Sequence, residues 1–97
     1  MTKTKSYQAE LIESLRNSRE AAEYLNAALE EDDPELFLLA LRNVAEAQGG
    51  MAQLAEKTKL NRESLYKMLS ERGNPELRSL ETLLHALGLR LAVTVAK

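Results

Sequence analysis

The chain has 97 residues, a net charge of −2, no cysteine and a single histidine. This length is enough for one small hydrophobic core, and the lack of cysteine excludes a disulfide framework and thiolate metal sites. No apolar run reaches the roughly 18 residues of a membrane span, and no signal-peptide core follows the first residues. We therefore expect a cytoplasmic protein that binds no metal and no cofactor.

Aliphatic residues dominate the composition, which is 44% hydrophobic but only 4% aromatic. A core made mainly of leucine and alanine favours helices. The charge is distributed unevenly: residues 1–50 carry five basic and ten acidic side chains, whereas residues 51–97 carry eight basic and five acidic ones. The second half of the chain is therefore the half that suits a polyanionic partner.

The first third of the chain predicts two amphipathic helices. The first runs from residue 7 to about 15, and its apolar face is formed by Tyr7, Leu11, Ile12 and Leu15. Asn17 and Ser18 can cap the second helix, and Glu20 follows Asn17 at the spacing of a capping box. The apolar face of this second helix is formed by Ala21, Tyr24, Leu25, Ala28 and Leu29.

A third helix is predicted from residue 34 to about 47. Asp33 is suited to the N-cap and Pro34 to the first helical position. Residues 36–41 are six consecutive apolar residues that cover more than half of the helix circumference. We expect this helix to be sandwiched between the N-terminal helices and the part of the chain that follows. Gly49 and Gly50 end it.

Residues 51–70, MAQLAEKTKLNRESLYKMLS, predict a helix-turn-helix. Apolar side chains stand where two short helices would bury against each other, at Leu54, Leu60, Leu65 and Met68. Ala55 is small enough for the helices to cross closely, and Asn61 is a good N-cap for the second helix. The outward positions of the second helix are Arg62, Glu63, Tyr66, Lys67 and Ser70.

Such an outer face suits the major groove of DNA. The candidate DNA contacts are Gln53, Lys59, Asn61, Arg62, Glu63, Tyr66, Lys67 and Arg72. Arg62 is the best candidate for a guanine edge because its guanidinium fork matches O6 and N7, although a salt bridge with a neighbouring carboxylate is the alternative. Tyr66 either contacts DNA or packs over Arg62. The alternative for the whole motif is a structural role without DNA.

After a turn at residues 72–75, a leucine-rich helix is predicted from about residue 76 to 87, and Gly88 ends it. His85 lies away from the leucine stripe and is expected to be an exposed surface residue. The tail alternates as a β-strand does, with one face formed by Leu89, Leu91, Val93 and Val95. Because a lone strand is unstable, we expect these four residues to pair with the same strand of a second subunit. The leucine-rich helix is the alternative dimer interface.

Five strings carry a family resemblance: EYLNAAL at 23–29, DPELFLLAL at 33–41, GGMAQLAEKTKLNRESLYKML at 49–69, GNPEL at 73–77 and ALGLRL at 86–91. Together they resemble the probable addiction-module antidote proteins, HigA-like antitoxins of the λ-repressor-like (Cro/XRE-type) helix-turn-helix superfamily. The resemblance implies a DNA-binding antitoxin that represses its own operon and neutralises a small toxin, often a RelE/HigB-like ribonuclease. The family usually has glycine in the turn where this chain has Lys59, so a left-handed backbone would be mildly strained there.

The predicted fold class is all-α. Residues 34–97 are expected to form a λ-repressor-like helix-turn-helix bundle with a short C-terminal β-strand, and residues 1–33 an N-terminal helical extension. This extension is acidic and is not needed for DNA recognition, so we expect it to face a small basic toxin, with contacts from Glu20, Glu23 and Glu30. The alternative is that these helices only cover the apolar segment 36–41.

Nothing in the sequence predicts an enzyme. There is no nucleophile–base pair and no glycine-rich phosphate loop, so no catalytic residue is expected. The acidic run at residues 30–33 lies at a helix boundary, where carboxylates have local structural roles. Two other functions fit the sequence: a free-standing prophage-type repressor that binds operator DNA without a toxin, and a protein-interaction module that does not bind DNA.

Overall fold

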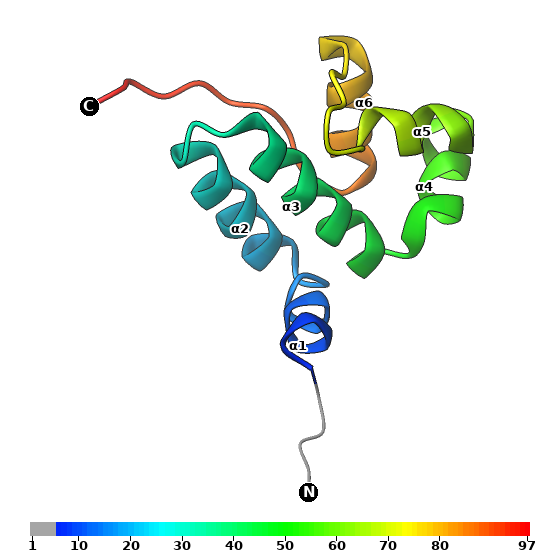
Figure 1. Ribbon diagram of the computed structural model, residues 1–97, viewed down its shortest axis with the longest axis horizontal. Helices are drawn as coiled ribbons and strands as arrows, with labels where there is room; N and C mark the ends of the chain where they lie inside the picture. Colours follow the sequence, from blue (N-terminus) through cyan, green and yellow to red (C-terminus); the bar gives the residue numbers. More distant parts are fainter. Residues whose placement is uncertain (1–5) are drawn as a thin grey trace, which may run out of the picture.

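The computed structural model describes residues 6–97, and within them it contains six α-helices and no β-strand. The helices are α1 (Tyr7–Ser14), α2 (Ser18–Glu30), α3 (Pro34–Ala47), α4 (Gly50–Thr58), α5 (Arg62–Met68) and α6 (Leu77–Ala86). Helices α2 and α3 lie side by side, α4 and α5 lie beyond the end of α3, and the chain after α6 runs back toward the α2–α3 turn (Figure 1). The predicted all-α class is confirmed.

Side-chain caps fix where several helices begin. Asn17 Oδ1 accepts a hydrogen bond from the backbone N–H of Glu20 (3.0 Å), and Asp33 Oδ1 accepts one from the N–H of Glu35 (3.0 Å). These predicted N-caps are confirmed. The reciprocal half of the capping box is not formed, because the N–H of Asn17 donates to the carbonyl of Ser14 instead (3.3 Å).

Helix α3 is the centre of the fold and packs against α1, α2 and α4. Its side chains Leu38, Leu41 and Val44 are buried. The expected position between the N-terminal helices and the later ones is therefore confirmed. The apolar run 36–41 is not buried along its whole length, since Leu36 and Leu39 are exposed on the part of α3 that no other helix within residues 6–97 covers.

A single leucine-rich cluster runs through the molecule, and its fully buried members include Leu15, Leu41, Leu65, Leu69 and Leu83. Three residues that the sequence assigned to apolar faces are exposed instead: Tyr7, Leu29 and Leu77. Each lies in the first or last turn of its helix. The amphipathic pattern extends to these ends of the helices, but no other helix within residues 6–97 buries them.

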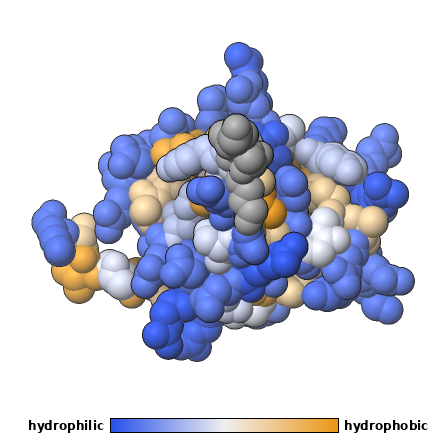
Figure 2. All heavy atoms as spheres, turned by 90° about the horizontal axis from the view of Figure 1, so that it is seen from below, coloured by the Kyte–Doolittle hydropathy of each residue, from blue (hydrophilic) through white to orange (hydrophobic). Residues whose placement is uncertain are grey.

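The predicted strand at residues 89–95 is not found among the described residues. The N–H of Leu89 donates to the carbonyl of Leu84 (2.8 Å), and beyond it the backbone of residues 90–97 makes no hydrogen bond within residues 6–97. A strand requires a second strand as its hydrogen-bond partner, and residues 6–97 supply none. The end of this segment protrudes from the body and carries hydrophobic atoms (Figure 2).

One buried polar side chain, which sequence analysis did not identify, joins three helices. Asn43 on α3 donates through Nδ2 to the Tyr24 hydroxyl on α2 (2.8 Å) and accepts through Oδ1 from Gln8 Nε2 on α1 (3.0 Å). Gln48 adds a second link, because its Nε2 donates to the carbonyl of Leu15 (3.0 Å). Polar contacts thus fix how α1 and α2 sit on α3, in addition to leucine packing.

We expect Asn43→Ala to lower the free energy of unfolding by about 2 kcal/mol, because it removes two partly buried hydrogen bonds and leaves their partners unpaired. Urea unfolding followed by circular dichroism measures this loss.

Two further variants test how much the individual hydrogen bonds of this network contribute to stability. Tyr24→Phe removes one of the two bonds and should cost about 1 kcal/mol, while Gln8→Ala, at an exposed position, should cost less than about 0.5 kcal/mol. Equal effects of all three substitutions would contradict the central role of Asn43.

Candidate nucleic-acid interface

Helices α4 and α5 are joined by the three residues 59–61. Lys59 has a φ of 65°, and its N–H donates to the carbonyl of Ala55 (2.9 Å), so it forms a left-handed cap at the end of α4. Thr58 stabilises the turn through two hydrogen bonds. Its hydroxyl donates to the carbonyl of Leu54 (2.8 Å) and accepts from the N–H of Leu60 (3.2 Å). The left-handed conformation therefore occurs at the turn position where the family resemblance implies glycine.

Helix α5 has one buried side and one exposed side. Leu65 and Leu69 are fully buried, and Met68 is half-buried against the same core. The N-cap predicted at Asn61 is confirmed, with Oδ1 accepting from the N–H of Ser64 (2.7 Å). The exposed side carries Arg62, Glu63, Tyr66 and Lys67, as expected. Ser70, also expected outward, is half-buried, and its hydroxyl donates to the carbonyl of Lys67 (2.8 Å).

Of the remaining candidate DNA contacts, two lie directly before or after α5 and one lies apart from it. Lys59 lies in the turn before α5 and Arg72 in the loop after it, and both are exposed. Lys67 and Arg72 line a common hollow of about 570 Å³ between α5 and the start of α6. Gln53 lies apart from this hollow, in the first turn of α4, where its side chain folds against Gly49.

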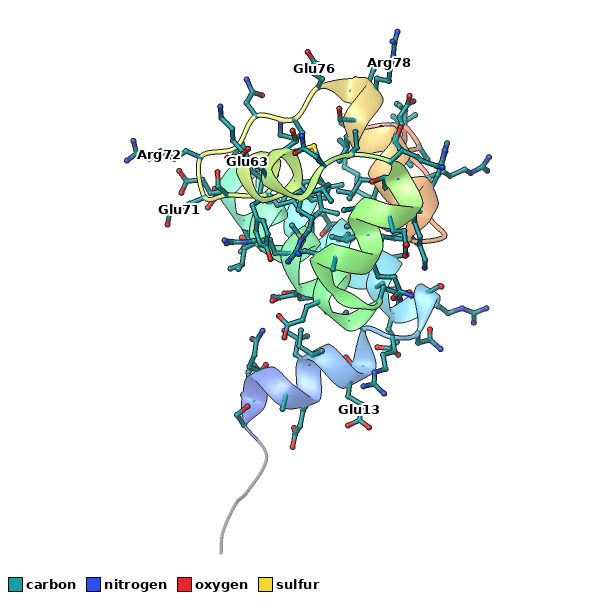
Figure 3. All side chains as sticks on the ribbon, turned by 90° about the vertical axis from the view of Figure 1, so that its right-hand side faces the viewer. Glu13, Glu63, Glu71, Arg72, Glu76 and Arg78 are labelled. Carbon is teal, nitrogen blue, oxygen red and sulfur yellow. The ribbon has the colours of Figure 1, made fainter. Side chains whose placement is uncertain are left out.

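The charge around α5 is mixed. Within residues 6–97, neither Arg62 nor Lys67 nor Arg72 forms an ion pair or a side-chain hydrogen bond. Two carboxylates lie nearby, because Glu63 at the start of α5 and Glu71 in the following loop are on the same side as Arg72 (Figure 3). The cationic groups are therefore free to reach a partner, but they do not form a uniform basic patch.

Sequence analysis missed the contribution of α6 to this surface. Asn74 and Ser79 line the same hollow as Lys67, and Glu76 does not cap α6 with its side chain. The open N-terminus of a helix favours anions. The breaker residues 73–75 did indicate where α6 begins, but nothing in the sequence pattern indicated that this end lies beside α5.

The chain leaves α5 through a tight turn at Gly73. Its N–H donates to the carbonyl of Ser70 (2.9 Å), and a Cβ at this position would collide with the carbonyl oxygen of Met68. Position 73 therefore has no room for a side chain. The close approach holds the loop that carries Arg72 directly against the end of α5.

A second charged surface lies on the outer side of α2. Glu20, Glu23 and Glu30 are all exposed, and their spacing of three and seven residues places them on one side of the helix. His85 is exposed, as expected. Within residues 6–97, no group of three or more acidic or histidine side chains is arranged to hold a metal ion. No helix in that range is long and apolar enough to cross a membrane.

Comparison with known proteins gives one family and one relative. Residues 4–95 match the family model described as "Probable addiction module antidote protein", and this match spans all six helices. A protein of Haemophilus influenzae described as uncharacterized is 39% identical over 84 residues, which cover 87% of this chain and 86% of that protein. No solved structure gives a significant match.

We expect Lys59→Gly to raise the free energy of unfolding by about 0.5–1 kcal/mol, because glycine adopts the left-handed conformation without the strain that a Cβ causes. Urea unfolding of the variant and the parent chain measures the difference.

Asp32 provides a matched control, since its φ of 56° is also left-handed. Aspartate tolerates this conformation better than lysine, so Asp32→Gly should gain less than Lys59→Gly. A loss of stability in Lys59→Gly would show that the turn is not strained.

Proposed function

The chain belongs to the probable addiction module antidote family, and we propose that it is an antitoxin that represses its own operon. Membership of an antidote family implies a toxin partner. In this proposal α4 and α5 form a DNA-binding helix-turn-helix that reads an operator, and the outer side of α2 binds a small basic toxin.

One observation carries the DNA-binding part of the proposal. Helix α5 is anchored by fully buried leucines on one side, while Arg62, Tyr66 and Lys67 on the other side are exposed and have no hydrogen-bond or ion-pair partner within residues 6–97. A short helix held in this way is suited to enter the major groove. The absence of a carboxylate partner for Arg62 argues against the salt bridge that was its alternative role.

The proposal gives different roles to the exposed residues around α5. Arg62, in the first turn, reads a guanine edge, and Glu63 accepts from a cytosine amino group. Asn61 Oδ1 accepts a hydrogen bond from the N–H of Ser64 as the cap of α5, and its Nδ2 donates to DNA. Lys67 and Arg72 contact phosphates together with the open N-terminus of α6.

Three further candidate contacts lie at the edges of this surface. Lys59 in the turn reaches a phosphate, and Tyr66 contacts the backbone or a thymine methyl group. Gln53 contacts DNA only if its side chain turns away from Gly49, against which it is folded here.

The toxin-binding part rests on charge and accessibility. Glu20, Glu23 and Glu30 are exposed on α2, and the apolar contacts of this helix with α3 are made from its opposite side by Ala21, Leu25 and Ala28. Proteins that act on RNA tend to be basic, so an acidic helix surface is a suitable counterpart.

We expect the chain to bind DNA of its own promoter as a dimer, with affinity that falls steeply as salt rises. Arg62→Ala should cost about 1–3 kcal/mol of binding free energy and relax specificity at one base position. Fluorescence anisotropy with promoter and random duplexes at several salt concentrations measures both effects.

Arg19→Ala is the matched control, because Arg19 is an exposed arginine on α2, which lies across the molecule from α5 (Figure 1). It should leave binding unchanged. Equal affinity for promoter and random DNA would exclude a sequence-specific repressor and favour the protein-interaction module.

We expect the triple variant Glu20→Lys, Glu23→Lys and Glu30→Lys to bind the toxin at least about tenfold more weakly, because like charges would face the basic partner. Any small basic protein encoded beside this gene serves as the probe, and calorimetry or a pull-down gives the affinity. Operator binding should be retained.

Reversal of Glu46, Glu56 and Glu81 changes the net charge by the same amount at exposed positions outside α2. This control should keep toxin binding. Undiminished toxin binding by the α2 variant would remove that surface from the proposal, and operator binding without any toxin complex would indicate a free-standing repressor.

A further inference from the structure

A groove of about 520 Å³ lies between α2 and the C-terminal tail, residues 89–97. On the helical side it is lined by Leu25 and Leu29 of α2, Phe37 of α3 and Leu84 of α6. On the other side it is lined by residues of the tail itself. We call it the tail groove. The tail therefore borders this groove without filling it.

The apolar floor of the tail groove is only partly covered within the chain. Leu29 remains 50% exposed, although it lies between two hollows. Leu29 and Phe37 also line a second hollow of about 470 Å³ that continues toward Gly73 and Pro75. The two hollows thus form one apolar surface along the ends of α2 and α3, and exposed apolar surface of this kind favours a protein contact.

The tail has unsatisfied groups of its own. Val93 is 97% exposed and Val95 is 93% exposed, and the backbone of residues 90–97 makes no hydrogen bond within residues 6–97. An extended segment with alternating apolar side chains and unpaired backbone groups is a template for pairing with another strand.

Charge indicates what the groove can accept. The chain carries no acidic side chain after Glu81, while the tail carries Arg90 and Lys97. On the helical side the only charged residue that lines the groove is Glu30, and the adjoining hollow is lined by Asp32 and Asp33, while Arg90 lines the groove from the tail. An apolar floor with acidic groups on its helical side complements an extended segment that is apolar and basic, and the tail has this chemistry.

We propose that the tail of a second copy lies in the tail groove and pairs antiparallel with the tail that borders it. A two-fold axis places each tail in the groove of the other copy, so the contact is isologous and closed. The result is a two-stranded ribbon between the α2 helices of the two copies. A ribbon of this size is stable only when it packs against other elements, which the grooves provide. The proposal does not rest on DNA or toxin binding.

The first test is the mass of the full-length chain in solution, measured by light scattering over a range of concentrations. The parent chain should have twice the mass of one 10.8 kDa chain. Val93→Asp should raise the dimer dissociation constant on the order of a hundredfold or more, because the carboxylate would be buried in the ribbon. Circular dichroism should show unchanged helix content, since this side chain is exposed in the single chain.

Leu77→Asp is the matched control, because Leu77 is an exposed apolar residue at the start of α6. It should leave the dimer intact. A monomeric parent chain would overturn the proposal, and so would a dimer that Leu77→Asp dissociates but Val93→Asp does not.

The second test uses the absence of native cysteine in the chain. Asn26 and Thr94 line the groove from α2 and from the tail. When the Asn26→Cys and Thr94→Cys proteins are mixed and oxidised, a disulfide-linked heterodimer should form. Ala52→Cys, exposed on α4, should not cross-link with Thr94→Cys. Another protein in this test is a single chain that carries both cysteines. If a disulfide forms only within that chain and never between chains, the groove closes on its own tail, and the proposal is overturned.

Discussion

The apolar side chains of α3 impose the main constraint on this fold. The buried residues of α3 occupy more than half of the helix circumference, which a single neighbouring helix cannot cover; they are Leu38, Ala40, Leu41, Asn43, Val44 and Ala45. Helices α1, α2 and α4 therefore all pack on α3. Because α4 is one of them, the burial of α3 also determines where α5 begins and which of its sides meets solvent.

The helix boundaries were predictable because their causes are local. Asn17, Asp33 and Asn61 cap helices through hydrogen bonds to residues two or three positions later, so the short sequence strings contain all that is needed. Burial at helix ends was not predictable in this way. Tyr7 and Leu77 continue apolar patterns, but whether they are covered depends on neighbours that are distant in the sequence. The same reason explains why the strand predicted at residues 89–95 is absent: no other segment within residues 6–97 supplies its backbone hydrogen bonds.

The candidate nucleic-acid interface was also predictable only in part. The orientation of α5 followed from the spacing of Leu65 and Leu69, since a helix places such residues on one side. One feature could not be read from spacing: the proximity of the α6 N-terminus to Lys67, which results from the path of the loop after α5. Asn43 was missed because a single asparagine in an apolar helix carries no pattern that indicates its partners, Gln8 and Tyr24.

The tight turn at Gly73 has a consequence for the surface that we propose binds DNA. The backbone at this position lies so close to the Met68 carbonyl that a Cβ would collide with it, so the loop and the end of α5 pack together as one unit. Arg72 is carried on that unit, so its backbone position relative to Arg62 and Lys67 is set when the chain folds. Aligning the backbone that carries these three cations costs conformational entropy, and this entropy is therefore lost during folding and not during association. Preorganisation of this kind favours tight binding.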